Sequence, residues 1–422
     1  MKARGFGSTD VGRERESNED AFLLDDDLGI YAVSDGMGGH AAGEEAARLA
    51  IEAVRESITI AGQRIESRDL DHSVLRRLAT DAMRAAGARV YERATTVPEL
   101  SGMGCTLTLL LTSGSRAVMG HVGDTRLYLH REGSTWQLSS DHTLAADLVR
   151  RGEITEGDAK EHPYANALTR ALGSQESVDP ETLMLDVLPD DVFLLCSDGL
   201  SQYLDGPAEL STSLGSDDLS SVPGELVAKA NEKGGRDNIT AVVVRVVPGD
   251  QEQDAVLSRD VRIGLKALRQ VPVLGATRFA DLLRMFNLAE VQTHERGAII
   301  AGAQDRMHAL YIPLVGELDI FRSDGSSFRI QRGQAIGLTS LLVPRRWNVR
   351  VEAHSEARLL SIDGRAFREL ARRRPWMGVR IFSALAEELE RELPDLVKYG
   401  ESPSGNTTPW WSPGRWFRGS AR

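Results

Sequence analysis

Residues 30–47 decide the fold of the N-terminal half, and they read IYAVSDGMGGHAAGEEAA. An apolar run ends at Asp35, three glycines and a histidine follow, and small residues that suit a helix come next. The apolar run indicates a buried strand. A carboxylate followed by glycines is either an ordinary turn or a place where the backbone approaches a charged group very closely.

Strands and helices are mixed through the first 247 residues. Two amphipathic patterns, at 43–58 and 73–94, predict helices. The order of strands, then two helices, then several strands is not the alternation of a doubly wound sheet, and the short turns favour antiparallel pairing. We therefore predict a layered α+β domain in which helices pack on antiparallel sheets. The predicted strands are 21–25, 29–35, 105–112, 116–124, 126–131, 191–198 and 239–247.

The composition excludes several classes of protein. The 422 residues carry a net charge of −12, which argues against a nucleic-acid-binding protein. The sequence has no run of about 18 apolar residues, so we expect no membrane-spanning segment. The two cysteines, Cys105 and Cys196, lie inside apolar runs, which indicates a reducing compartment without disulfides. We expect a cytoplasmic protein.

Acidic residues stand at five strand ends or turns. Any one of them alone is best explained as turn chemistry. Together, carboxylates that converge at one end of a sheet raise one another's pKa and are tolerated when cations lie between them. Oxygen ligands suit Mg²⁺ or Mn²⁺, whereas no His/Cys cluster has the spacing of a zinc site. The acidic positions are Glu19-Asp20, Asp35, Asp124, Asp198 and Asp237.

Eight motifs, in this order and spacing, resemble the bacterial form of the metal-dependent serine/threonine protein phosphatases, also called the PPM or type-2C family. The resemblance covers about residues 5–247, and its one visible departure is Cys105, where bacterial members often have Thr. It implies α/β/β/α layers and a flap at 141–172 that covers the site. The motifs are TDVGRERESNEDAF (9–22), SDGMGGHAAGE (34–44), MGCTLTLLL (103–111), HVGDTRLYLHREG (121–133), SSDHTLAADLVRRGEI (139–154), NALTRALG (166–173), LLCSDGL (194–200) and GGRDNITAVVV (234–244).

The resemblance also implies the metal-binding residues. Asp35 bridges two ions, Mn²⁺ or Mg²⁺, and the backbone carbonyl of Gly36 binds one of them. Glu19 helps to hold one metal through water. The remaining positions implied by the resemblance are Asp20 at the same metal as Glu19, Asp198 and Asp237 at the other metal, and Asp124 at a third, weaker one.

Two further residues gain catalytic roles by the same resemblance. Arg15, four residues before Glu19, binds the substrate phosphate, and His40, five residues after Asp35, is the general acid. The implied function is hydrolysis of phosphoserine and phosphothreonine on proteins that a Ser/Thr kinase has phosphorylated. The alternatives are a non-catalytic phosphatase-fold scaffold that binds phosphoproteins and a two-metal hydrolase of another phosphoester.

Residues 263–394 have a different pattern, separated from residues 1–247 by a predicted linker at 248–262. Short strands between Gly-bearing turns predict a small jelly-roll-like β-barrel, followed by helices. This part resembles the cyclic nucleotide-binding domain family, but Leu338 follows Gly337 where nucleotide-binding members usually have Glu. We therefore expect a regulatory, dimerisation or docking domain.

The end of the chain adds two expectations. The helix at about 374–393 carries apolar residues at helical spacing, which suggests a contact with a second copy or a partner. Residues 395–422 predict a flexible tail rich in Trp and Arg. The apolar positions of that helix are Val379, Phe382, Leu385 and Leu389.

Overall fold

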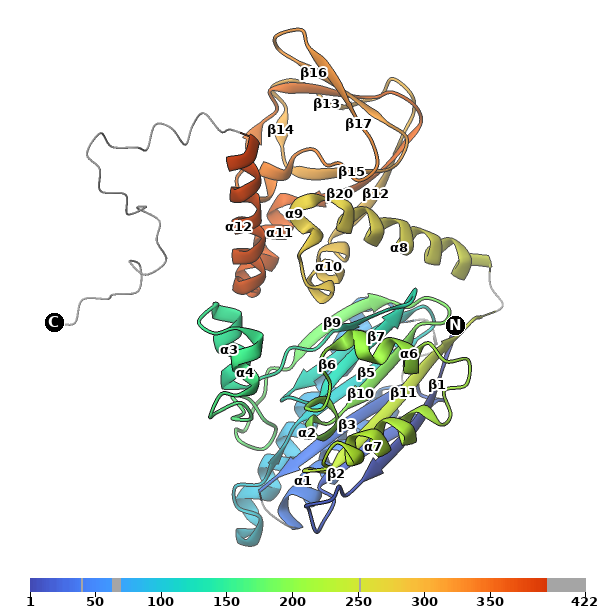
Figure 1. Cartoon of the computed structure of the whole chain (residues 1–422). Coiled ribbons are helices and arrows are strands. Elements are labelled where there is room, and N and C mark those ends of the chain that lie inside the picture. Colours follow the sequence, from blue (N-terminus) through green and yellow to red (C-terminus); the bar gives the residue numbers. More distant parts are fainter. Residues whose placement is uncertain (39–40, 63–69, 250–251, 393–422) are drawn as a thin grey trace, which may run out of the picture.

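The structure is a computed structural model that describes residues 1–38, 41–62, 70–249 and 252–392 (Figure 1). His40 and the predicted tail at 395–422 lie outside the described residues. Among the described helices, none is long and apolar enough to cross a membrane.

Two antiparallel sheets form the centre of the N-terminal unit. The first has the order β1-β11-β10-β7-β8 and the second the order β2-β3-β5-β6-β9, with β4 paired to β3. The strands of the first sheet are β1 (Lys2–Asp10), β11 (Ile239–Val247), β10 (Val192–Cys196), β7 (Arg126–Arg131) and β8 (Ser134–Gln137). Those of the second are β2 (Asp20–Asp25), β3 (Ile30–Met37), β4 (Gly104–Cys105), β5 (Leu107–Ser113), β6 (Arg116–Val122) and β9 (Glu181–Asp186).

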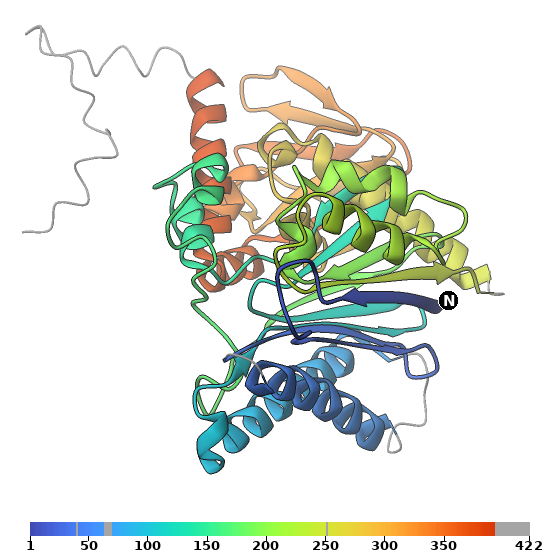
Figure 2. The same cartoon turned by 60° about the horizontal axis from the view of Figure 1, so that its bottom comes forward.

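Helices cover the outer faces of both sheets. The long helices α1 (Ala41–Gly62) and α2 (His72–Thr96) pack their alanine-rich faces on the second sheet. The helices α5 (Asp198–Ser201), α6 (Ser211–Leu214) and α7 (Val222–Glu232) cover the first. Figure 2 shows the strands between the two groups of helices. The prediction of α/β/β/α layers with antiparallel sheets is thereby confirmed.

The C-terminal unit begins with helices and continues with short strands. The helices are α8 (Glu252–Gln270), α9 (Pro272–Gly275) and α10 (Phe279–Phe286), followed after the strands by α11 (Gly364–Arg373) and α12 (Pro375–Glu392). The strands are β12 (Ala289–His294), β13 (Ile299–Ala301), β14 (Arg306–Met307), β15 (Ala309–Val315), β16 (Leu318–Arg322), β17 (Ser327–Ile330), β18 (Arg345–Arg346), β19 (Val349–Ala353) and β20 (Ala357–Asp363).

The C-terminal strands form a jelly-roll-like arrangement that is not a closed barrel. In the described chain they pair as three separate sheets, β12-β20-β15, β13-β19-β16-β17 and β14-β18. Register shifts between Ile299 and Ala301 and between Pro313 and Val315 interrupt the ladders. The prediction of a β-rich roll is confirmed, and the prediction of a barrel needs this correction.

The boundary between the units differs from the predicted linker. Helix α8 begins at Glu252, so most of 248–262 is helical. Its residues Val261, Leu265 and Leu268 are buried at helical spacing, and they belong to the same apolar core as strands of both sheets. Trp136 of β8 also stacks on Phe279 of α10, with ring centroids 4.1 Å apart. The two units therefore share one core.

The face of α12 is largely used within its own chain. Ile381 and Leu385 are buried, and Phe382 contacts Phe367 of α11 edge-on at 6.0 Å between ring centroids. Val379 is exposed. The side chain of Leu389 lies outside the described part. The apolar spacing of this helix thus reflects packing on its own unit, and only Val379 of the described positions is free to meet another chain.

Candidate metal centre

The predicted carboxylates are placed by the ends of paired strands. Asp20 opens β2 and is the register partner of Asp35 in β3. Asp198 lies two residues after the end of β10, and Asp237 lies two residues before the start of β11, which pairs with β10 in the first sheet. Asp124 lies in the turn between β6 and β7. Both sheets therefore deliver their acidic residues to the same end of the sandwich.

Two glycines allow the first helix to approach this end. A Cβ atom on Gly36 would lie 2.0 Å from the carbonyl oxygen of Gly43, and one on Gly43 would lie 2.2 Å from Oε2 of Glu19. The amide of Gly36 also donates to the carbonyl oxygen of Glu19 at 3.0 Å. Gly36 thus allows β3 to approach the backbone of the helix, and Gly43 allows the helix to approach the carboxylate of Glu19.

The carboxylates raise one another's pKa. Burial and the neighbouring Asp20 and Asp198 raise the pKa of Asp35 well above its usual value. Burial raises the pKa of Asp20 to about 7, with Asp198 and Asp237 adding to the shift against two hydrogen bonds. Burial raises the pKa of Asp124, and Asp198 adds to the effect. Carboxylates that repel one another in this way favour bound cations, because the positive charge offsets the repulsion.

Two buried carboxylate oxygens are unpaired within the described chain. They are Oδ1 of Asp20 and Oδ1 of Asp198. The other oxygen of Asp20 accepts hydrogen bonds from Ser197 Oγ and Thr240 Oγ1, both at 2.7 Å. Because buried polar atoms are nearly always satisfied, these two oxygens fit a metal ion or its water. The donor set, all oxygen, fits Mn²⁺ or Mg²⁺.

Arg15 lies at the rim of this group. Its Nη2 donates to Oδ2 of Asp237 at 2.8 Å, and its side chain is 49% exposed. Partial burial opposes the shift, but Asp237, Glu19 and Asp35 raise the pKa of Arg15. An exposed guanidinium next to the carboxylates is well placed to meet an anion.

The side chains are not gathered tightly around a single point. Within the residues that the structure describes, no three His, Cys, Asp or Glu side chains already form a group that could hold a metal ion. Asp237 is turned toward Arg15, and Asp20 toward the hydroxyls of Ser197 and Thr240. In this arrangement Oδ2 of Asp237 and Oδ2 of Asp20 are both engaged by other groups of the chain.

Sequence reasoning missed Asn238, the residue that holds the segment between β1 and β2 in place. Asn238 accepts from the amide of Glu19 at 2.8 Å and donates to the carbonyl oxygens of Val11 and Ser17 at 2.9 and 2.8 Å. It thereby fixes the segment that carries Arg15 and Glu19. The available signal was its position in GGRDNIT, directly after Asp237.

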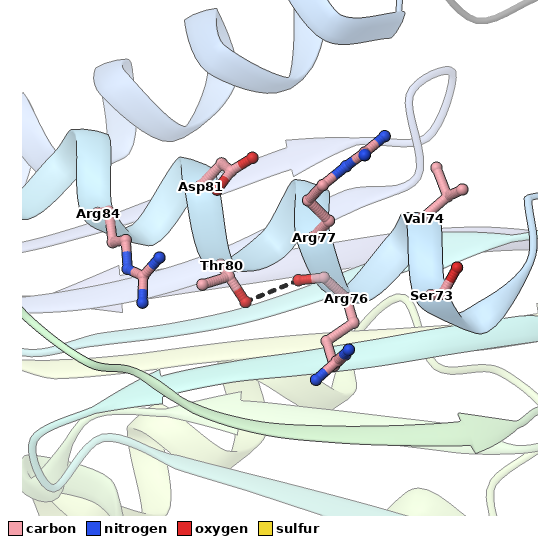
Figure 3. Close-up of a pocket in the computed structure, with 7 residues that line it drawn as sticks. All are labelled: Ser73, Val74, Arg76, Arg77, Thr80, Asp81 and Arg84. Atoms are coloured by element: carbon pink, nitrogen blue, oxygen red, sulfur yellow. Dashed lines mark hydrogen bonds between the residues drawn. The ribbon is translucent and has the colours of Figure 1, made fainter.

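A hollow on the surface of α2 lies apart from this centre. It has a volume of about 410 Å³ and is lined by residues of one helix. Figure 3 shows Arg76 and Arg84 pointing to one side of the helix and Arg77 to the other. No predicted site residue lines this hollow. Its lining residues are Ser73, Val74, Arg76, Arg77, Thr80, Asp81 and Arg84.

Comparison with known proteins agrees with the fold and the acidic centre. The family described as "Protein phosphatase 2C" matches residues 11–233, and the "Cyclic nucleotide-binding domain" matches residues 291–374. The serine/threonine phosphatase stp of Listeria welshimeri is 34% identical over 240 residues, which cover 56% of this chain and 93% of that protein. The serine/threonine protein phosphatase PstP of Mycobacterium tuberculosis is 36% identical over 245 residues, 58% of this chain and 45% of that protein.

Solved structures of serine/threonine phosphatases are also similar to this chain. The crystal structure of the M. tuberculosis phosphatase PstP/Ppp has a TM-score of 0.53 at 33% identity and covers 59% of this chain and 100% of its own. The catalytic domain of PstP in complex with two manganese ions has a TM-score of 0.52 at 33% identity and covers 58% of this chain and 99% of its own. The predicted resemblance is confirmed: the chain belongs to the protein phosphatase 2C family of metal-dependent serine/threonine phosphatases, and its C-terminal unit carries a cyclic nucleotide-binding-type domain.

Proposed function

We propose that this protein hydrolyses phosphoserine and phosphothreonine in proteins that a Ser/Thr kinase has phosphorylated. The observation that carries the proposal is the buried group of carboxylates at one end of the sandwich, with unpaired oxygens on Asp20 and Asp198. When bound, a pair of Mn²⁺ or Mg²⁺ ions supplies Lewis acidity and positive charge for the attack of water on phosphorus.

The residues of the chain have separate roles in this proposal. Asp35 and the carbonyl of Gly36 hold the metals together with Asp198 and Asp237. Glu19 and Asp20 would support one of these two metal ions, and Asp124 would bind a third ion. Arg15 releases Asp237 and binds the phosphate oxygens, which a planar guanidinium matches in two parallel hydrogen bonds.

The leaving group needs a proton. The alkoxide of serine or threonine is a poor leaving group, and His40 is proposed to protonate it. The role of His40 rests on its place in the motif SDGMGGH. We further propose that the protein acts in the cytoplasm and that its C-terminal unit is regulatory, with a partner or second copy binding on that unit.

A substrate panel tests the proposal. Phosphothreonine peptides should be hydrolysed in the presence of Mn²⁺, hydrolysis should stop with EDTA, and Asp35→Asn should remove nearly all activity. Nucleotides and other phosphoesters, supplied at the same concentration, should react far more slowly. Full activity of a well-folded Asp35→Asn protein would contradict the two-metal assignment, and preference for nucleotides would favour a different phosphoester hydrolase.

A further inference from the structure

Glu181, the first residue of β9, connects the two units of the chain. Its side chain is 5% exposed, and its Oε1 accepts a hydrogen bond from Arg284 Nη2 of α10 at 2.6 Å. The same oxygen forms an ion pair with Nη1 of Arg374, which lies between α11 and α12, at 2.8 Å. One carboxylate of the N-terminal unit is therefore held by two arginines of the C-terminal unit.

The surrounding charges complete a buried network. Arg284 also donates to Asp281 at 3.0 Å, and Asp281 accepts from Arg380 of α12 at 2.9 Å. Burial opposes ionisation of Glu181, but His142 and the two arginines lower its pKa well below the usual range. Since removal of one partner leaves another charge buried and unpaired, the network holds the two units in a defined geometry.

The other oxygen of Glu181 faces the flap. His142 Nε2 lies 3.6 Å from Oε2, which is an ionic contact distance and too long for a good hydrogen bond. The amide of Gly123 donates to His142 Nδ1 at 3.1 Å, and the amide of His142 donates to the carbonyl oxygen of Gly123 at 2.8 Å. Because an amide can only donate, Nδ1 is the acceptor, and the ring proton of a neutral His142 lies on Nε2, toward Glu181.

His142 is thereby tied to the metal centre and to the flap. Gly123 precedes Asp124 and has φ of +107°, and a Cβ atom there would lie 2.4 Å from Thr106, so this turn has little freedom. The carbonyl oxygen of His142 accepts from the amide of Thr169 at 2.7 Å. The backbone and the side chain of His142 together thus join the turn before a proposed metal ligand to both ends of the flap.

We propose that Glu181 is a positioning residue through which the C-terminal unit, by Arg284 and Arg374, sets the Gly123–Asp124 turn and the base of the flap. The contacts run from Arg284 of α10 and from Arg374, between α11 and α12, through Glu181 to His142 and on to Gly123, and the 3.6 Å approach of Glu181 to His142 is their longest step. The proposal rests on the proposed function, because the position of Asp124 matters for catalysis only in a phosphatase of this kind.

Hydrogen exchange of the metal-free full chain tests the coupling without using activity. Arg374→Gln removes one arginine from Glu181 at a partly exposed position. Arg373→Gln is the matched control, because within the described chain its side chain is 70% exposed and forms its ion pair with Glu369, away from Glu181. We expect the amides of Gly123 and Thr169 to exchange about 2- to 30-fold faster in Arg374→Gln and at the wild-type rate in Arg373→Gln.

A double variant separates coupling from simple interface packing. Glu181→Gln should accelerate exchange at Gly123, and Arg374→Gln should add little to it, since residues that act through one partner are not additive. In the Mn²⁺-loaded enzyme, Arg374→Gln should lower kcat at an unchanged KM for p-nitrophenyl phosphate, as expected for a residue that acts through Glu181.

Two outcomes would overturn the proposal. Unchanged exchange at Gly123 in Arg374→Gln would show that the contacts carry no coupling. Faster exchange spread evenly over the whole chain would show a purely structural role. If the wild-type chain lacked phosphatase activity while Gly123 still responded, the proposed function would fail and the coupling would stand.

Discussion

Removing the metals should expose the repulsion within the acidic centre as a pH-dependent loss of stability. The group to follow is Asp20, whose pKa burial raises to about 7. An unfolded Asp titrates near 3.9. Between these two values the folded state binds more protons than the unfolded state, so the free energy of unfolding falls as the pH rises.

The size of this effect follows from the two pKa values. From pH 5 to pH 8, linkage gives a loss of about 2–3 kcal/mol for Asp20. Another buried group works in the opposite direction. Burial lowers the pKa of His121 to about 4, so its folded state remains neutral while the unfolded state binds a proton near pH 5, which gives a gain of about 2 kcal/mol over the same range. The absolute pH slope therefore does not isolate Asp20.

The comparison with Asp20→Asn removes the contribution of His121 and reports on Asp20 together with its repulsion of Asp35. Both proteins keep His121, so the EDTA-treated wild type should lose about 2–3 kcal/mol more than Asp20→Asn between pH 5 and pH 8. Thermal unfolding at the two pH values measures the difference, which corresponds to roughly 5–10 °C in Tm for a domain of 150–250 residues. Saturating Mn²⁺ should restore the stability of the wild type at pH 8, because a ligand that binds only the folded state stabilises that state.

Parallel curves of stability against pH for the wild type and Asp20→Asn would refute this prediction. If wild type and Asp20→Asn changed equally between pH 5 and pH 8, Asp20 would titrate normally and the acidic centre would not be under electrostatic repulsion. A wild type that lost less stability than Asp20→Asn would give the wrong sign for the whole argument.

Three further predictions concern catalysis and ligand binding. His40→Ala should slow hydrolysis of phosphothreonine peptides more than that of p-nitrophenyl phosphate, because nitrophenolate leaves without a proton; equal losses in a comparison of kcat would remove the general-acid role. Asn238→Ala, which removes one buried and two part-buried hydrogen bonds, should destabilise the chain by about 3 kcal/mol in denaturant unfolding and lower kcat/KM, whereas wild-type kcat/KM would show that the segment from Val11 to Glu19 needs no such support. The full chain should not bind cyclic AMP or cyclic GMP at micromolar concentration in calorimetry, because Leu338 replaces the usual glutamate and the buried Trp347 packs against Gly337; tight binding would contradict this.

Local patterns were sufficient to predict the acidic centre. The strand ending at Asp35 and the strand opening at Asp20 were both visible as apolar runs, and antiparallel pairing placed the two residues opposite each other. The period of two in such strands fixes the face of the sheet to which each carboxylate points. The sequence could not show that Arg15 binds Asp237, because that contact joins residues 222 positions apart and leaves no local pattern.

The same limit applies to the C-terminal unit. The polar residues near 252 looked like a linker, although Val261, Leu265 and Leu268 continue a helical period that is buried against the N-terminal sheets. The apolar spacing of α12 was real, but spacing alone does not say which surface covers Leu385. Packing between distant segments decided both cases.

The shared core constrains how a C-terminal domain can act on this phosphatase. A regulatory domain that binds weakly can dissociate as a whole, but here α8 and α10 belong to the same apolar core as the catalytic sheets. Separation would expose that surface and the buried charges of Glu181 and Arg284, which is strongly unfavourable. A signal received by the C-terminal unit must therefore arrive as a small rearrangement across a closed interface. The contacts of Glu181 with His142 and the arginines lie where such a rearrangement reaches the turn before Asp124 directly.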